Sequence, residues 1–224
     1  MLKRSGILGI SGMSAHLQTL AMVMKTTSFS VTFDYRCPFA RNVNEHVVAG
    51  LQAGATWEVT FLPFNLDETH VEEGEPSAFE DPVKVTNTLA LQAGVVVRDT
   101  LPDKFLDVHL GLFRARHDES RDLRDKEVIG SVLESCGVDA AGVFDAMDEG
   151  WPLERVRQEH EKVVNDYQVF GVPTFILNDC AVFVRLMNRP KDGVRDPKEA
   201  VGFILDLIAN NPDINELKHT TISH

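Results

Sequence analysis

The chain has 224 residues, 43% of them hydrophobic and 25% charged, a composition that lets a protein of this size bury a core without disulfides or metal. Its formal net charge of −12 disfavours nucleic acids and anionic membranes as partners, since both require basic surfaces. No stretch approaches the roughly 18 consecutive apolar residues of a transmembrane helix, so we expect no contact with a membrane.

Three cysteines are too few for a disulfide framework. Cys37, Cys136 and Cys180 also lack the spacing of metal ligands, so we expect no metal site and a reducing, cytoplasmic location. Residues 1–27 begin with a basic pair, but their apolar run is interrupted and no clear cleavage site follows. We therefore interpret them as a loose extension and not as a signal peptide.

The first part of the fold is predicted as strand, helix, strand. Residues 28–35 alternate apolar and polar side chains and indicate a strand, as do residues 56–64. Between them, apolar residues recur at steps of three and four from Ala40 to Leu51, and Gly54 is a suitable helix C-cap. A single helix between two strands makes a βαβ unit, so these strands should be parallel.

An acidic segment follows, with seven carboxylates between Asp67 and Asp81. The simplest interpretation is a solvated linker, and the alternative is a specificity role beside a site. Residues 83–150 have helical patterns throughout, and a further helix follows Pro152. Apolar stretches at about 174–177 and 180–184 then predict a hairpin, and Asp196 with Pro197 predicts the start of a last helix.

This order gives an α/β fold in which an all-helical segment interrupts a four-stranded sheet. The expected units are an extension (1–27), a first sheet part (28–82), a helical insertion (83–150), a second sheet part (151–212) and a tail (213–224).

The chemistry centres on Cys37, which lies where the first strand meets the first helix, in the sequence "FDYRCPFA". A helix N-terminus favours an anion through its free N–H groups and dipole, and Pro38 is well tolerated in a first turn. Arg36 and Arg41 flank the cysteine, and their charges favour a thiolate. We therefore predict a reactive Cys37 with a depressed pKa; the alternative is a structural cysteine at a turn.

A second motif, "FGVPTF" at residues 170–175, opens the third predicted strand. Together the two motifs, the inserted helices and the terminal hairpin and helix resemble the DsbA-like branch of the thioredoxin fold. That branch includes 2-hydroxychromene-2-carboxylate isomerases and kappa-class glutathione transferases, and the resemblance covers roughly residues 28–210. It implies a thioredoxin-like sheet with an inserted helical subdomain and Cys37 as the nucleophile.

The resemblance also implies a substrate groove. Pro173 would be in the cis form, and the Val172 backbone would pair with an extended thiol substrate. Further groove residues would come from the active-site stretch, namely Tyr35, Arg36, Pro38 and Phe39.

This sequence departs from the dithiol members at Ala40, which replaces the cysteine that attacks the mixed disulfide. Cys136 lies on an apolar helical stripe and Cys180 begins a strand, so we expect neither to resolve an adduct. What remains is monothiol chemistry with a small-molecule thiol or disulfide substrate, in which glutathione or mycothiol is a co-substrate that is not tightly bound. Arg185 and Arg189 are candidates for binding that anionic thiol, with ordinary surface arginines as the alternative.

Three functions stay open at this point. The first is a DsbA-like oxidoreductase or thiol transferase with Cys37 as nucleophile. The second is a thiol-dependent isomerase or transferase of the chromene-carboxylate or kappa type. The third is a non-catalytic binding protein that keeps the fold. The histidines indicate no metal site, because His109 and His117 are eight residues apart and His160 lies on an apolar stripe.

Overall fold

The computed structural model describes residues 26–190 and 195–221, so nearly all of the predicted extension lies outside the described residues. The elements follow the predicted order closely. They are β1 (Thr27–Phe33), α1 (Pro38–Gln52), β2 (Trp57–Pro63), the short 3-10 helix η1 (Glu68–His70), α2 (Pro82–Thr86), α3 (Leu89–Thr100), α4 (Pro102–His117), α5 (Lys126–Ser135), α6 (Ala140–Asp148), α7 (Trp151–Tyr167), β3 (Thr174–Leu177), β4 (Cys180–Phe183) and α8 (Pro197–Asn210).

The four strands form one mixed sheet in the order β2-β1-β3-β4. β1 and β2 are parallel as predicted, whereas β3 runs antiparallel to β1 and β4 antiparallel to β3. β1 is a central strand with neighbours on both edges, and its apolar side chains Phe29, Val31 and Phe33 are all buried. The predicted α/β fold with a helical insertion is confirmed.

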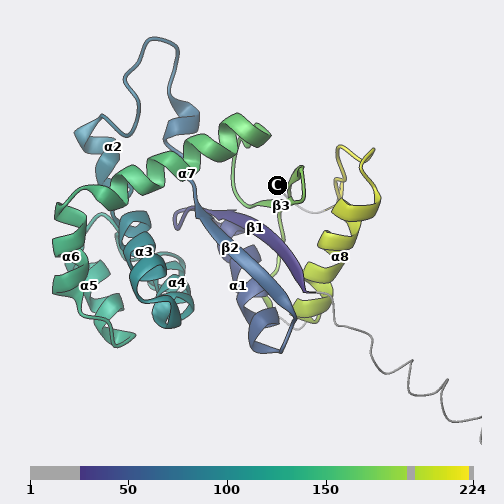
Figure 1. Cartoon of the computed structure of the whole chain (residues 1–224), viewed down its shortest axis with the longest axis horizontal. Coiled ribbons are helices and arrows are strands. Elements are labelled where there is room, and N and C mark those ends of the chain that lie inside the picture. Colours follow the sequence, from purple (N-terminus) through teal and green to yellow (C-terminus); the bar gives the residue numbers. More distant parts are fainter. Residues whose placement is uncertain (1–25, 191–194, 222–224) are drawn as a thin grey trace, which may run out of the picture.

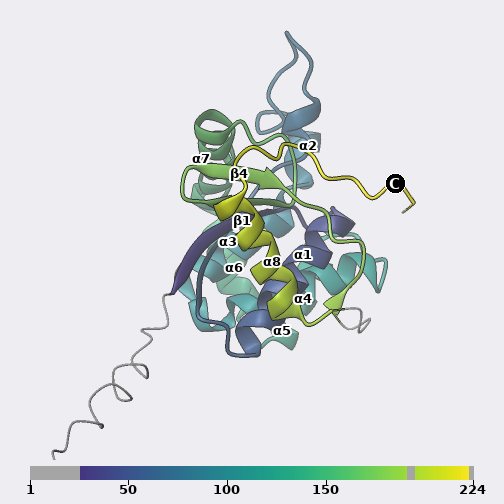
Figure 2. The ribbon, with the colours of Figure 1, turned by 90° about the vertical axis from the view of Figure 1, so that its right-hand side faces the viewer.

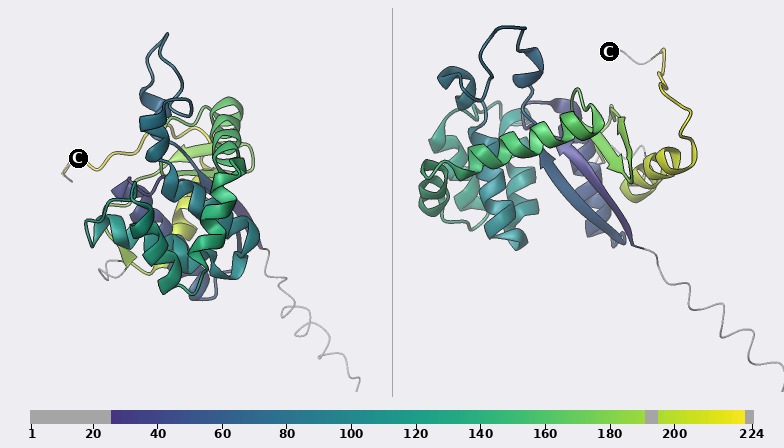
Figure 3. Two further views of the ribbon diagram at one scale, coloured as in Figure 1. Left: turned by 90° about the vertical axis from the view of Figure 1, so that its left-hand side faces the viewer. Right: turned by 45° about the horizontal axis from the view of Figure 1, so that its top comes forward.

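In Figure 1 the inserted helices α3–α6 gather to the left of the sheet, and α8 lies to its right. α7 is the long helix that returns the chain from the insertion to the sheet, and it contacts both α3 and β2. α1 packs against α8 and also against α4 of the insertion. Figure 2 shows α8 on the side of the molecule nearest the viewer, and the right-hand view of Figure 3 shows α7 crossing in front of the upper ends of β1 and β2. α1 is thus held from both sides.

The helix ends are set by local chemistry. Asp196 accepts hydrogen bonds from the N–H groups of Lys198 and Glu199, so α8 begins where the sequence predicts. α1 begins with Pro38 and is followed by Gly54 in the left-handed region at φ 80°, a conformation that glycine adopts without strain. Within residues 26–190 and 195–221, no helix is long and apolar enough to cross a bilayer.

Candidate active site

Cys37 is the N-cap residue of α1, where it closes the turn between β1 and the helix. Its N–H donates to the Asp34 carbonyl (3.0 Å), and its own carbonyl accepts from the Arg41 N–H (3.1 Å). The Ala40 N–H points at the Cys37 Sγ at 3.4 Å. The sulfur therefore occupies the place of a capping oxygen, aligned with the unpaired N–H groups of the first turn.

The loop before β3 lies directly against this sulfur. Cys37 Sγ is 3.5 Å from the Val172 carbonyl oxygen, to which the thiol donates, and the Val172–Pro173 bond is cis. The loop is held by the sheet itself, because the Thr174 N–H donates to the buried Thr32 Oγ1 of β1 (2.9 Å). The two motifs, 135 residues apart in the sequence, thus meet at the same end of β1.

The predicted depressed pKa of Cys37 is wrong for the protein as it folds. Burial raises the pKa of the thiol above its ordinary value, and the charge of Asp34 acts in the same direction. The N–H groups of Ala40 and Phe39, together with the charge of Arg185, favour the thiolate but do not outweigh the burial. The Cys37 thiol therefore keeps its proton at neutral pH.

Arg36 cannot supply the positive charge that the sequence suggested, because carboxylates neutralise it. Its guanidinium pairs with Asp34 (2.7 Å) and with Asp67 (2.8 Å). Asp67 also accepts from the Asn87 side chain (2.7 Å). The first residue of the acidic segment, Asp67, therefore packs against the active-site turn, so the segment is not a solvated linker at this point.

Arg41 and Arg189 are engaged in a second cluster. Arg41 pairs with Glu45 (3.2 Å) and with Asp118, and Arg189 pairs with the same two carboxylates. This cluster joins α1, the end of α4 and the segment that follows β4. In this structure both arginines therefore hold these three elements together, and neither presents an uncompensated charge to a ligand.

A buried series of hydrogen-bonded polar groups supports the turn between β1 and α1 from the protein interior. Tyr35 Oη lies 3.0 Å from His109 Nδ1, His109 Nε2 lies 3.0 Å from Asn44 Oδ1, and Asn44 Nδ2 donates to the Ala40 carbonyl (2.8 Å). Burial lowers the pKa of His109 to about 3, so its imidazole is neutral. Since Asn44 presents its oxygen, Nε2 carries the proton and Nδ1 accepts from the tyrosine. Every group in the series is thus satisfied.

These hydrogen bonds change the role predicted for Tyr35. Its side chain is only 1% exposed, so it cannot touch a substrate and instead supports the turn. A Cβ at Gly94 of α3 would lie 2.6 Å from the Tyr35 hydroxyl, so only glycine admits that approach. The His117 Nε2 also contacts the Tyr35 carbonyl at 2.9 Å. The insertion therefore fixes the residues that lead into Cys37.

Sequence reasoning missed four supporting residues, Thr32, Asp34, Asn44 and His109. All four are buried polar side chains. Asn44 and His109 lie at positions that the apolar helical pattern buries, and that conflict is the signal that could have found them. Thr32 and Asp34 occupy the polar positions of the alternation along residues 28–35 and give no such signal. His109, for example, lies within the stripe of Phe105, Val108 and Leu112 on α4.

The remaining predicted site residues surround the sulfur on its outer side. Pro38 is exposed and Phe39 is half-buried. Val172 and Pro173 are buried and contribute backbone. Arg185 is exposed, and its guanidinium lies 5.0 Å from the centre of the Phe39 ring.

No second thiol lies within reach of Cys37. All three cysteines are free, and Cys136 is the C-cap of α5, half-buried with its sulfur 3.8 Å from Ser135 Oγ, a position less buried than its apolar stripe suggested. Cys180 begins β4 at the turn of the hairpin. Among the described residues, no group of histidine, cysteine and carboxylate side chains has the arrangement of a metal site.

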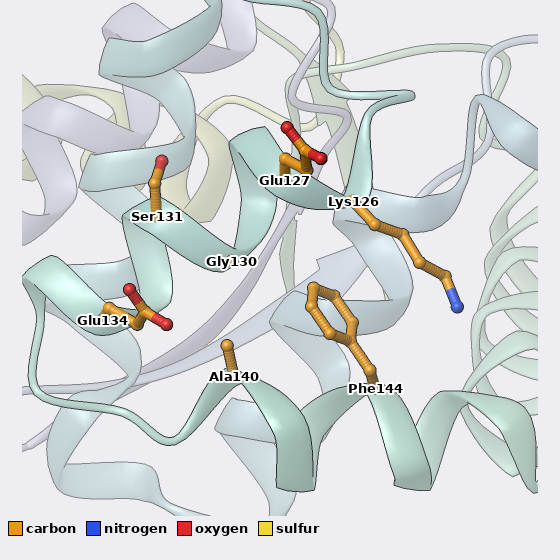
Figure 4. Close-up of a pocket in the computed structure, with 7 residues that line it drawn as sticks. All are labelled: Lys126, Glu127, Gly130, Ser131, Glu134, Ala140 and Phe144. Carbon is orange, nitrogen blue, oxygen red and sulfur yellow. The ribbon is translucent and has the colours of Figure 1, made fainter.

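A hollow between α5 and α6 lies apart from these groups (Figure 4). It encloses about 300 Å³ and is lined by residues of the two helices, among them Lys126, Glu134 and Phe144. It contains no cysteine and no residue of α1 or of the loop before β3, so it takes no part in thiol chemistry.

Comparison with known proteins agrees with this geometry. A thiol:disulfide interchange protein, DsbL of Lelliottia amnigena, is 30% identical over 150 residues, which is 65% of the length of each chain. Among solved structures, a 2-hydroxychromene-2-carboxylate isomerase has a TM-score of 0.58 at 16% identity and covers 82% of this chain and 98% of its own. A probable DsbA oxidoreductase of Streptomyces coelicolor has a TM-score of 0.57 at 15% identity, with 87% and 94% covered. At such identities the structures show a shared fold.

The family itself is shown by a sequence model of the DSBA-like thioredoxin domain, which matches residues 30–188. That range includes both Cys37 and the cis-proline loop and excludes only the N-terminal segment and the end of the chain. The chain therefore belongs to the DsbA-like thioredoxin family.

Proposed function

We propose that this protein is a thiol oxidoreductase or thiol transferase that works with one cysteine and an external low-molecular-weight thiol. The observation that carries the proposal is the position of Cys37, which caps α1 with its sulfur 3.5 Å from the Val172 carbonyl. A substrate that lies along this loop brings its own sulfur to the one thiol at the helix N-terminus.

The reaction is thiol–disulfide exchange. The Cys37 thiolate attacks one sulfur of a disulfide, a new bond forms between the two sulfurs, and the other half leaves as a thiolate with the electron pair of the broken bond. Because Ala40 cannot attack the adduct, a second thiol such as glutathione or mycothiol does so and releases Cys37. The Cys37 proton leaves at the first step and returns at the last.

The raised pKa of Cys37 sets the conditions of this step. Only a small fraction of the Cys37 sulfur is thiolate at neutral pH, which makes the first attack slow. The Ala40 N–H still faces the sulfur, so the anion is stabilised wherever it forms. The small thiolate fraction slows attack on every disulfide by the same factor, so only strongly electrophilic disulfides should react quickly at neutral pH.

Arg185 is the group best placed to bind an anionic co-substrate. Its charge reaches Cys37, and among residues 26–190 and 195–221 no carboxylate pairs with it. This makes it a better candidate than Arg189, whose guanidinium faces Glu45 and Asp118.

A second function, a thiol-dependent isomerase or transferase, is favoured by one observation. The neutral Cys37 thiol is a hydrogen-bond donor, which at present it directs to the Val172 carbonyl. It could donate equally to the sulfur of a bound thiol and so stabilise that sulfur as the attacking thiolate. A Cys37→Ser variant retains a donor and should keep such turnover, whereas Cys37→Ala should lose it.

Intact-mass analysis distinguishes the two functions. Wild-type protein exposed to oxidised glutathione should gain one glutathione by a mixed disulfide, and Cys37→Ser should gain none. Cys136→Ser and Cys180→Ser are the matched controls and should behave as wild type. If the adduct persists in Cys37→Ser, or is absent from the wild type at alkaline pH, the redox proposal fails.

A further inference from the structure

The outer side of the site carries an unusual row of aromatic side chains. Phe170 precedes the cis-proline loop and is 70% exposed, although it is a large apolar residue. Its ring lies 5.2 Å from the ring of Phe183 at the end of β4. A Cβ at Gly171 would lie 3.7 Å from the Phe183 ring, so this ring lies over the loop that contacts Cys37.

Arg185 continues the row toward the sulfur. Its guanidinium lies 6.0 Å from the centre of the Phe183 ring and 5.0 Å from that of Phe39, which is two residues after Cys37. We call Phe170, Phe183, Arg185 and Phe39 the aromatic row. It runs without interruption from the cis-proline loop, across β4, to the first turn of α1.

The chemistry of this row selects its ligand. The exposed ring of Phe170, in contact with the half-buried ring of Phe183, offers flat apolar surface to a planar ring. A guanidinium held over such rings keeps its N–H donors at the edge, where they suit a carboxylate. No carboxylate within the described ranges takes that place, in a protein whose net charge is −12.

The geometry points to the aromatic row as a binding site for the substrate, and to substrates whose sulfur is attached to an aromatic ring that bears an anionic group. The ring stacks on Phe170 and Phe183, and the anion pairs with Arg185. This inference rests on the proposed function, because it assigns the substrate class of the same Cys37 site. It goes beyond the proposed function by adding selectivity that the thiol alone cannot supply.

Three disulfides separate the two parts of the inference. Dithiobis(nitrobenzoate) is aromatic and anionic, dithiodipyridine is aromatic and neutral, and bis(hydroxyethyl) disulfide is neither. Stopped-flow rates are measured in a Cys136→Ser/Cys180→Ser background, so that only Cys37 reacts. Ratios of rates are compared between variants, because a change in the thiolate fraction affects all three reagents alike and cancels.

Arg185→Gln should lower the ratio of the anionic to the neutral aromatic reagent by about fivefold, the effect of one guanidinium at a partly exposed site. Phe170→Ala should lower both aromatic rates relative to the hydroxyethyl reagent by about threefold, through lost stacking surface.

The chain offers a matched control. Arg195 lies 5.0 Å from the ring of Phe203, which is 53% exposed on α8. Arg195→Gln and Phe203→Ala remove the same groups from a pair outside the row and should leave both ratios unchanged. If they lower the ratios as much as the variants of the row do, the effect comes from overall charge or nonspecific hydrophobic binding, and the inference is overturned.

Failure of the proposed function is distinguishable from failure of this inference. Naphthoate, an aromatic anion that cannot react with a thiol, is titrated into Cys37→Ser and followed by NMR. Shifts at Phe170 and Phe183 that disappear in Cys37→Ser/Arg185→Gln support the site even where Cys37 proves unreactive. Absence of binding at millimolar naphthoate, with unchanged rate ratios, refutes it.

Discussion

Removing a single hydroxyl, that of Tyr35, tests whether the buried polar chain holds the active-site turn. Tyr35→Phe leaves the shape of the ring unchanged and removes only the donor to His109 Nδ1, now 3.0 Å away. His109 is fully buried and neutral, so no water replaces the lost donor. An unsatisfied buried acceptor costs about 1–3 kcal/mol, and we expect the free energy of unfolding to fall by about 1–2 kcal/mol.

His109→Leu should cost more, about 2–4 kcal/mol, because both the Tyr35 hydroxyl and Asn44 Oδ1 then lose their partner. In the double variant only Asn44 remains unsatisfied. The two costs should therefore not add, and the coupling free energy should be about 1–2 kcal/mol.

Urea unfolding at neutral pH measures all three variants. The chain contains only one other tyrosine, Tyr167 at the half-buried end of α7, and Tyr167→Phe should change the free energy of unfolding by less than about 0.5 kcal/mol. A cost for Tyr35→Phe no larger than this, or full additivity with His109→Leu, would refute the proposed chain of hydrogen bonds.

Three further predictions concern protons and thiols. Burial lowers the pKa of His109 to about 3 and that of His160 to about 4, from 6.5, so the unfolded chain binds protons that the folded chain does not. The contribution of these histidines to the free energy of unfolding should therefore be fully present above pH 6.5, and the free energy should fall below pH 6.5 by about 1.4 kcal/mol per pH unit for each histidine. In thermal unfolding, the stability of His109→Leu should depend less steeply on pH than that of the wild type. The rate of Cys37 alkylation by iodoacetamide should still rise at about pH 8.5, the ordinary thiol pKa; a plateau near neutrality would contradict the raised value. Ala40→Cys treated with oxidised glutathione should form an internal disulfide with Cys37: Cys37 takes up one glutathione and releases the other, and the new cysteine then displaces the bound one, so that two reduced glutathiones leave. Intact mass detects the product as a loss of two hydrogens, whereas a lasting glutathione adduct would show that the second thiol cannot reach Cys37.

The sequence predicted the fold well because its apolar periodicities are strong and its helix ends are well marked. The strand around Val31, the helix that starts at Pro38 and the cap at Asp196 each rest on a local pattern, and local patterns survive folding. The meeting of Cys37 with Val172 needed the family resemblance, since no local pattern joins residues so far apart.

The electrostatics of the site could not be predicted in the same way. Arg36 and Arg41 lie close to Cys37 in sequence, and each has a local carboxylate partner, Asp34 for Arg36 and Glu45 of the same helix for Arg41. The remaining neutralisation comes from Asp67 and Asp118, which belong to other parts of the chain and are brought in only by folding. Arg185, in contrast, is remote in sequence and still acts on the thiol. Which arginine influences a cysteine depends on where the carboxylates lie after folding.

The charge of the site also determines how the two proposed functions exclude each other. An anion bound at Arg185 neutralises the group that favours the Cys37 thiolate, while Asp34 and burial already oppose that thiolate. A bound thiolate and an ionised Cys37 therefore compete for the same stabilising groups, and the site holds one negative sulfur more easily than two. A disulfide substrate brings a neutral sulfur and leaves the negative charge to Cys37, whereas a bound cofactor thiolate takes the charge and leaves Cys37 protonated as its donor. Because Ala40 takes the place of a second cysteine in the motif, the negatively charged sulfur must belong either to Cys37 or to the ligand.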